Sequence, residues 1–156
     1  MALLRILRDP DPTLRKTSRP VDAITPRIRI LIEDMKDTLR KAEGVGLAAP
    51  QVGVLRRVVI VDMGKGKYQE FINPEIIYTE GTQEEVEGCL SCPGKAGVVE
   101  RPAKVTVRAM NVSGEYFEAT GTELIARCFC HELDHLDGVL YIDKVKEMLE
   151  PEEEDK

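Results

Sequence analysis

Hydrophobic residues follow two different spacings along this chain, and each spacing predicts a different element. From Ile28 to Ala42 they recur every three or four positions, which is the period of an amphipathic helix. Thr25 followed by Pro26 provides an N-cap with proline at the first helical position, and Gly44 can end the helix. The first element predicted from the pattern is therefore a helix between Thr25 and Gly44.

The middle of the chain follows a period of two, which indicates short strands. Its apolar segments are rich in Val, Ile and aromatic residues and lie at 58–61, 71–72, 76–78 and 105–109. The sequence Asn-Val-Ser-Gly at 111–114 can form a turn. We therefore expect residues 104–119 to form an antiparallel hairpin.

A second helical pattern follows the hairpin, and apolar residues cover most of its circumference: Leu124, Ile125, Cys128, Phe129, Leu133 and Leu136. Thr120 and Glu123 have the spacing of a capping box, and Gly138 can end the helix. This order of elements predicts an α+β fold. Antiparallel β-sheets would pack around a buried C-terminal helix, with one further helix near the N-terminus.

Length and charge favour one domain followed by a short tail. The chain has 156 residues and no internal repeat or linker, so residues 1–146 are expected to form a single domain. Residues 147–156 hold five Glu, one Asp and one Lys, and therefore most of the net charge of −6. We expect them to be a frayed helix end that passes into a flexible acidic tail. The nearly neutral remainder lacks a basic face, so no direct nucleic-acid binding is expected.

The apolar stretches are too short to cross a membrane. The longest stretch without a charge covers the 12 residues 44–55, whereas a span needs about 20 apolar residues. Arg5 and Arg8 interrupt the N-terminal apolar residues before they could form a signal peptide. We expect a cytoplasmic protein without membrane association. Its four cysteines would then be reduced thiols, available for metal binding or catalysis.

The strongest chemical pattern is the sequence His131-Glu132-Leu133-Asp134-His135 within the second helix. Histidines four residues apart lie on one helical face and can share a metal ion. Glu132 lies about 100° around the helix and suits a general base better than a ligand. The alternative is a pair of surface histidines beside an acidic residue.

A catalytic metal of this kind needs a third protein ligand. Tyr141 stands where the metzincin pattern has its third histidine, which excludes that family, and the glutamates of the tail are poorly placed for a gluzincin site. Cys128 is expected to pack beside the metal and Cys130 to point elsewhere. Cys89 and Cys92 remain as candidates. The alternatives left open here are a redox pair and a closed site formed by all four cysteines.

The segment Gly44-Val45-Gly46-Leu47-Ala48-Ala49-Pro50-Gln51 carries a third, weaker pattern. Its glycines permit a close approach of a ligand to the backbone, and Gln51 offers a neutral amide donor. Together with Glu87-Gly88-Cys89-Leu90-Ser91 and His131-Glu132-Leu133-Asp134-His135, it resembles the three signature motifs of the peptide deformylase family, in the family's order. The resemblance extends from the Asp-Pro near the N-terminus to about Val145.

This resemblance implies a metal-dependent hydrolase that removes the N-formyl group from the formyl-methionine of newly synthesised polypeptides and releases formate. By matching positions, Cys89, His131 and His135 would hold one divalent metal ion. Fe²⁺ is expected from the family, and Zn²⁺, Ni²⁺ or Co²⁺ can occupy such a site in a purified protein. Glu132 would transfer the proton, while Gln51 and the backbone N–H of Leu90 would stabilise the oxyanion.

The methionine side chain needs an apolar slot, which we assign to Val45, Gly46, Leu124 and Cys128. The expected partners are N-formyl-methionyl nascent peptides. Cys92, Cys130 and the short acidic C-terminus depart from the family pattern, and an anionic tail does not favour ribosome association. The competing hypotheses are a metallopeptidase and a metal-stabilised binding module with a closed cysteine site.

Overall fold

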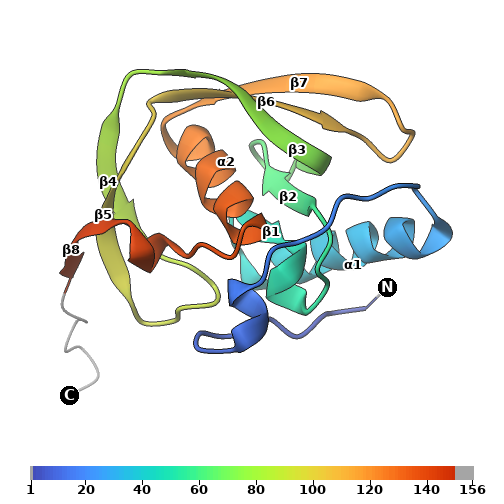
Figure 1. Ribbon diagram of the computed structural model, residues 1–156, viewed down its shortest axis with the longest axis horizontal. Coiled ribbons are helices and arrows are strands. Elements are labelled where there is room, and N and C mark those ends of the chain that lie inside the picture. Colours follow the sequence, from blue (N-terminus) through green and yellow to red (C-terminus); the bar gives the residue numbers. More distant parts are fainter. Residues whose placement is uncertain (1, 150–156) are drawn as a thin grey trace.

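The computed structural model describes residues 2–149 and shows two helices with two antiparallel sheets (Figure 1). The helices are α1 (Pro26–Ala42) and α2 (Glu123–Leu136), and short 3₁₀ turns are η1 (Pro12–Arg15), η2 (Ala49–Val52) and η3 (Tyr141–Asp143). The strands are β1 (Gly46–Ala48), β2 (Val58–Asp62), β3 (Tyr68–Glu80), β4 (Gln83–Glu87), β5 (Ala96–Arg101), β6 (Lys104–Met110), β7 (Tyr116–Thr122) and β8 (Val145–Leu149). This arrangement confirms the predicted α+β fold.

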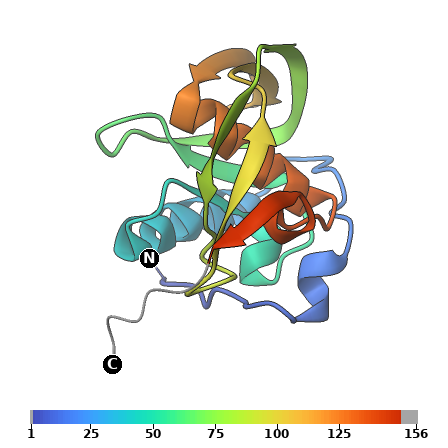
Figure 2. The same cartoon turned by 90° about the vertical axis from the view of Figure 1, so that its left-hand side faces the viewer.

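The two sheets enclose α2. One sheet has the strand order β1-β2-β3-β6-β7 and the other has the order β4-β5-β8, with antiparallel neighbours throughout. Helix α2 contacts both sheets and runs between them in the two views (Figures 1 and 2). None of the helices in residues 2–149 is long and apolar enough to cross a membrane.

The core consists of three apolar clusters that hold the helices and sheets together. The largest packs α2 on the five-stranded sheet, where Phe71 contacts the rings of Phe117 and Phe129 at centroid distances of 5.3 and 5.4 Å. A second cluster packs α1 on β1 and β2, and a third lies around Leu14 and Tyr141. Because α2 is fixed on both sides, its histidines have a rigid support.

The first helix and the hairpin form as predicted. The Thr25 hydroxyl accepts a hydrogen bond from the Ile28 N–H at 3.3 Å, and Pro26 occupies the first turn. However, Glu43 rather than Gly44 caps the C-terminal end, in the left-handed conformation with φ of 56°. Strands β6 and β7 form the expected hairpin, and the segments 71–72 and 76–78 belong to one strand, β3.

Three expectations about the C-terminal part were wrong. Thr120 does not cap α2, because it belongs to β7, where its hydroxyl lies 2.7 Å from that of Thr106; Thr122 precedes the helix. Leu124 is 49% exposed rather than buried. Residues 147–149 do not fray but belong to β8, which pairs with β5. The remainder of the predicted tail, residues 150–156, lies outside the described residues.

Candidate metal centre and hydrolytic site

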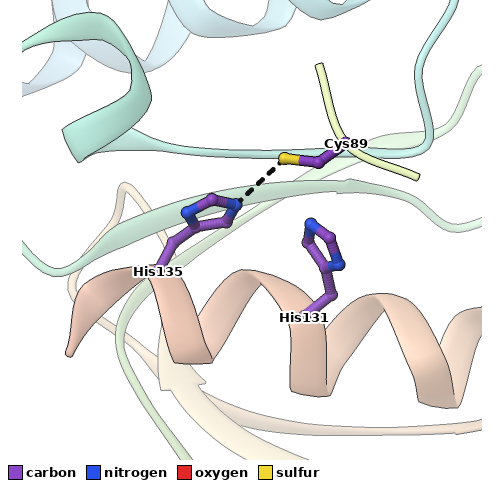
Figure 3. A group of neighbouring side chains, drawn as sticks. All are labelled: Cys89, His131 and His135. Atoms are coloured by element: carbon purple, nitrogen blue, oxygen red, sulfur yellow. Dashed lines mark hydrogen bonds between the residues drawn. The ribbon is translucent and has the colours of Figure 1, made fainter. Parts of the chain in front are cut away.

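Cys89, His131 and His135 come together at one point between β4 and α2 (Figure 3). Their ligand atoms lie within 4.8 Å of one another, and Cys89 Sγ is 3.4 Å from His135 Nε2. The two histidines project from successive turns of α2, whereas Cys89 comes from the turn that follows β4. A thiolate and two imidazoles form a donor set that suits a divalent transition metal, and three protein ligands leave a position for water.

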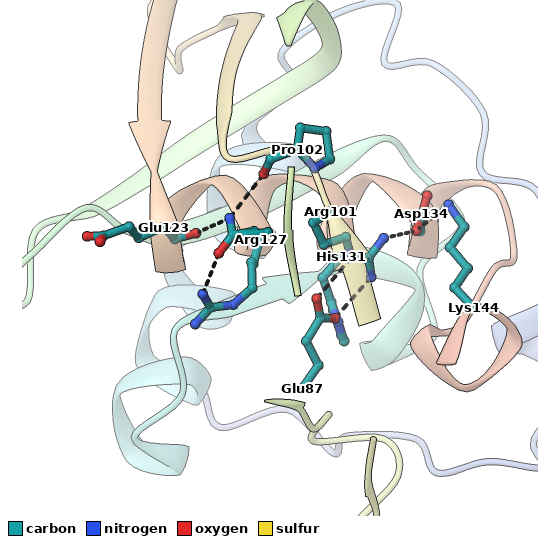
Figure 4. A network of polar contacts seen from close by, with 9 residues as sticks. Glu87, Arg101, Pro102, Glu123, Arg127, His131, Asp134 and Lys144 are labelled. Atoms are coloured by element: carbon teal, nitrogen blue, oxygen red, sulfur yellow. Dashed lines mark hydrogen bonds and ion pairs between the residues drawn. The ribbon is translucent and has the colours of Figure 1, made fainter. Parts of the chain in front are cut away.

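His131 is oriented by a buried ion pair (Figure 4). Glu87 lies 3.0 Å from His131 Nδ1 and receives two hydrogen bonds from Arg101, at 2.9 and 3.0 Å. Burial raises the pKa of Glu87, but the hydrogen bonds from His131 and Arg101 outweigh it and lower this pKa to about 2. Because ionised Glu87 can only accept, His131 Nδ1 must donate, which leaves the Nε2 lone pair for a metal.

His135 is suited to metal binding by its burial. Desolvation, followed by the neighbouring His131, lowers the pKa of His135 to about 3, so the ring is neutral near pH 7. Its Nδ1 has no hydrogen-bond partner within residues 2–149, and its Nε2 faces Cys89. The hydrogen bond with Cys92 and burial raise the pKa of the Cys89 thiol. A divalent cation among these three donors would reverse that effect by stabilising the thiolate.

Glu132 is a buried carboxyl beside the three potential ligands. It is 4% exposed, and its Oε1 has no hydrogen-bond partner within residues 2–149. Burial raises the pKa of Glu132 to about 7. A carboxyl group with a pKa near neutrality can both accept and return a proton, which a general acid–base catalyst requires.

Gln51 and Leu90 are neighbours of Cys89. The Gln51 carbonyl oxygen accepts from the Ala48 N–H at 2.9 Å, which turns its amide group toward Ser91 Oγ at 3.1 Å and Cys89 Sγ at 3.7 Å. No hydrogen bond from the Leu90 N–H is found within residues 2–149. The Gln51 amide thus lies close to the metal-binding group, and Leu90 directly follows Cys89 in the chain. Neutral N–H donors are what an oxyanion site requires.

A cavity of about 380 Å³ opens beside these residues. It is lined by the four residues expected to contact the methionine side chain, Val45, Gly46, Leu124 and Cys128, and by five of the expected catalytic and metal residues, Gln51, Cys89, Leu90, His131 and Glu132. His135 is not part of this lining, but its ligand atom lies within 4.8 Å of those of Cys89 and His131. The structure therefore brings together every site residue expected from the sequence.

Several residues that line or support the site were not anticipated. Glu87 is part of the second motif, but its role in orienting His131 was not predicted. Its partner Arg101 lies 14 residues further along the chain, and no local sequence pattern links the two. Arg127 also lines the cavity, four residues before His131. The spacing to the first histidine could have suggested Arg127, because positions four apart share a helical face.

The cysteine-only alternatives do not fit the described residues. In residues 2–149 the one group of potential ligands combines Cys89 with the two histidines. Cys128 lies against Gly46, and Cys130 is buried in the cluster between α2 and the large sheet. Cys92 follows Cys89 in a turn rather than a helix, with its N–H 2.9 Å from the Cys89 carbonyl oxygen.

Comparisons with known proteins agree with this geometry. A family model described as polypeptide deformylase matches residues 3–150. The peptide deformylase of Alkaliphilus metalliredigens is 56% identical over 93% of this chain and 98% of its own length, and that of Acetivibrio thermocellus is 54% identical over 98% and 89%. A solved peptide deformylase from Legionella pneumophila superimposes with a TM-score of 0.89 at 44% identity, covering 93% of this chain and 87% of that one. One from Thermotoga maritima gives 0.89 at 41% identity, covering 94% and 99%.

Proposed function

The chain belongs to the polypeptide deformylase family and is a metal-dependent hydrolase that removes the formyl group from N-terminal formylmethionine, and we propose how its own residues perform that reaction. The proposal rests mainly on one observation. The Cys89, His131 and His135 ligand atoms, within 4.8 Å of one another, lie beside a buried carboxyl group that has no partner for Oε1.

Cys89, His131 and His135 are the proposed metal ligands. When bound, a divalent metal would supply a Lewis acid that activates water and polarises the formyl carbonyl. We infer from the family to which the chain belongs that Fe²⁺ is the metal used in the cell; the thiolate and the two imidazoles are equally compatible with Zn²⁺, Ni²⁺ and Co²⁺. Glu87 would hold His131 in the orientation and tautomer that bind the metal.

Glu132 is the proposed proton carrier. Hydrolysis of a formamide requires a proton to leave water and a proton to reach the departing amine nitrogen. Glu132 lines the cavity and has a pKa raised to about 7 by burial, so one carboxyl group can perform both transfers. The products are formate and a free N-terminal amine.

Gln51 and Leu90 are the proposed oxyanion donors. As the formyl carbon becomes tetrahedral, its oxygen gains negative charge, which preorganised N–H groups stabilise strongly in a dry site. The Gln51 amide is fixed by its bond to Ala48, so little reorganisation is needed. Loss of one such donor typically costs about 100- to 1,000-fold in kcat.

Formyl-methionyl peptides, the N-termini of newly made polypeptides, are the proposed substrates. The unbranched methionine side chain would enter the slot formed by Val45, Gly46, Leu124 and Cys128, where the partly exposed Leu124 forms the outer wall. The acidic C-terminal residues are unsuited to electrostatic attachment to ribosomal RNA, so we propose that ribosome association does not depend on them.

The test is formate release from a formyl-Met peptide after anaerobic loading with Fe²⁺. Cleavage of internal peptide bonds is measured in parallel, because such cleavage without formate release would indicate a metallopeptidase instead. Glu132→Gln should retain the metal and lose most turnover, since it removes the proton acceptor but no ligand. Cys89→Ala should lose the metal, whereas the matched variant Cys92→Ala should retain it. Equal metal loss in both cysteine variants would contradict the ligand assignment.

A further inference from the structure

The rim of the catalytic cavity carries one cation that the hydrolytic reaction does not use. Arg127 is half-buried on α2 and lines the cavity together with Val86 and Leu124. It precedes His131 by four residues, one helical turn or about 6 Å along the axis. Arg127 therefore stands on the same helical face as a metal ligand, and its side chain is partly exposed to solvent.

Arg127 is held in place by a fully satisfied amide (Figure 4). Its Nη1 donates to Gln83 Oε1 at 2.8 Å, and Gln83 Nε2 donates to the carbonyl oxygens of Pro102 and Glu123, both at 3.0 Å. Backbone carbonyl oxygens only accept hydrogen bonds, so both must face the amide nitrogen of Gln83. The amide oxygen of Gln83 must therefore face Arg127. The guanidinium position is thus fixed from three different segments of the chain.

The partner that fixes Arg127 is neutral. Within residues 2–149 Arg127 forms no ion pair. The nearby Arg101, in contrast, is bound by the carboxylates of Glu87 and Asp134 at 2.9 and 2.8 Å. Gln83 consequently restricts the Arg127 side chain without compensating its charge. A guanidinium fixed in this way is preorganised for a carboxylate, which it can bind through two N–H groups.

We propose that Arg127 is a specificity-determining residue that binds the carboxylate side chain of a substrate residue at the first or second position after formylmethionine. The inference rests on the proposed use of the cavity. The formyl group and the methionine side chain would fill its interior, and Arg127 is a cationic lining residue that is only half-buried, so the rest of the peptide would leave the cavity past Arg127. The whole protein carries a net charge of −6 and repels anionic peptides at long range. A preference for acidic peptides would therefore have a local origin.

The experiment compares kcat/KM for formyl tripeptides that differ in one side chain. The full-length, metal-loaded protein is given formyl-Met-Glu-Ala and formyl-Met-Gln-Ala, and likewise formyl-Met-Ala-Glu and formyl-Met-Ala-Gln. All four peptides have amidated C-termini, so the glutamate side chain is the only carboxylate by which each pair differs. We expect glutamate to be favoured over glutamine at one or both positions by about two- to fivefold, the factor of a partly exposed ion pair, with a smaller ratio at high salt.

Variants of Arg127 and Gln83 test whether the Arg127 side chain causes the preference for glutamate over glutamine. Arg127→Gln should bring the Glu/Gln ratio close to one, and Arg127→Lys should retain part of it, because lysine keeps the charge but not the planar fork. Gln83→Ala should lower the ratio less than Arg127→Gln does, since it frees the guanidinium without removing it. The matched control Arg29→Gln removes an exposed arginine on α1 and should leave the ratio unchanged.

Two outcomes would overturn the inference. One is a Glu/Gln ratio of one or below at both positions in the wild type. The other is an equal ratio in the wild type and Arg127→Gln. If none of the four peptides released formate, the proposed reaction itself would be rejected. Failure of the Arg127 proposal can therefore be distinguished from failure of the proposed function.

Discussion

Gly46→Ala tests whether the catalytic carboxyl and the glycine-rich segment are as closely packed as the structure shows. A Cβ atom at Gly46 would lie 2.5 Å from Cys128 Sγ and 2.8 Å from both Cγ and Oε2 of Glu132. Ordinary contacts begin near 3.4 Å, so these groups must move by roughly 0.6–0.9 Å, and displacement of a catalytic group by about 1 Å can cost ~100-fold in rate.

The stability of the Gly46→Ala variant should fall as well. Overpacking of a buried site costs about 1–3 kcal/mol, which corresponds to a decrease in Tm of roughly 2–12 °C for a domain of this size. Gly44→Ala is the matched control in the same segment. Its Cβ would meet the flexible methyl ends of Leu39 and Leu90, at 2.9 and 3.1 Å, rather than the carboxyl of Glu132. Gly44→Ala should therefore retain most of kcat/KM.

The assays are formate release from formyl-Met-Ala, thermal unfolding and metal content. Adding Cys128→Ala to Gly46→Ala removes the sulfur contact but not the contacts with Glu132, so the double variant should recover Tm without recovering kcat/KM. Wild-type kcat/KM for Gly46→Ala, with its metal bound, would refute the assignment of Glu132 as the proton carrier in this position.

Three further predictions concern the metal support, the pocket and pH. Glu87→Gln should weaken metal binding about 10- to 100-fold in a competition titration, because it replaces the carboxylate that orients His131 with a neutral and weaker acceptor; unchanged affinity would contradict this. Leu124→Ala should narrow the preference for formyl-Met over formyl-Ala, which we expect to be roughly 10- to 200-fold in kcat/KM; an unchanged preference would remove Leu124 from the pocket. Burial disfavours the Glu70 carboxylate, but Lys36 at 3.0 Å and two backbone N–H groups lower its pKa below the ordinary 4.5. Glu70→Gln should thus destabilise the protein at pH 7, and its difference from the wild type in urea unfolding should shrink as the pH falls below about 4.5; a difference independent of pH would contradict this origin.

Local patterns in the sequence determined the helices and the chemistry. The helix from Thr25 and the histidines at 131 and 135 depend on residues within a few positions of one another, where the helical period relates spacing directly to a shared face. Which residues of the three motifs meet was predicted from their resemblance to the peptide deformylase family, because local spacing alone left both Cys89 and Cys92 open as the third ligand. The C-terminal strand β8 could not be found in this way, because its short sequence Val-Lys-Glu-Met-Leu has no clear strand pattern and becomes a strand only through pairing with β5.

Only the tertiary structure decided how the site is supported and bounded. Thr120 has the local spacing of a helix cap, yet its pairing with Thr106 in the hairpin overrides that preference. Glu87 meets Arg101, and Gln83 meets Arg127 44 positions away, because the small sheet packs against α2. Contacts between distant segments depend on the path of the chain rather than on spacing, so the charge at the cavity rim is a property of the fold.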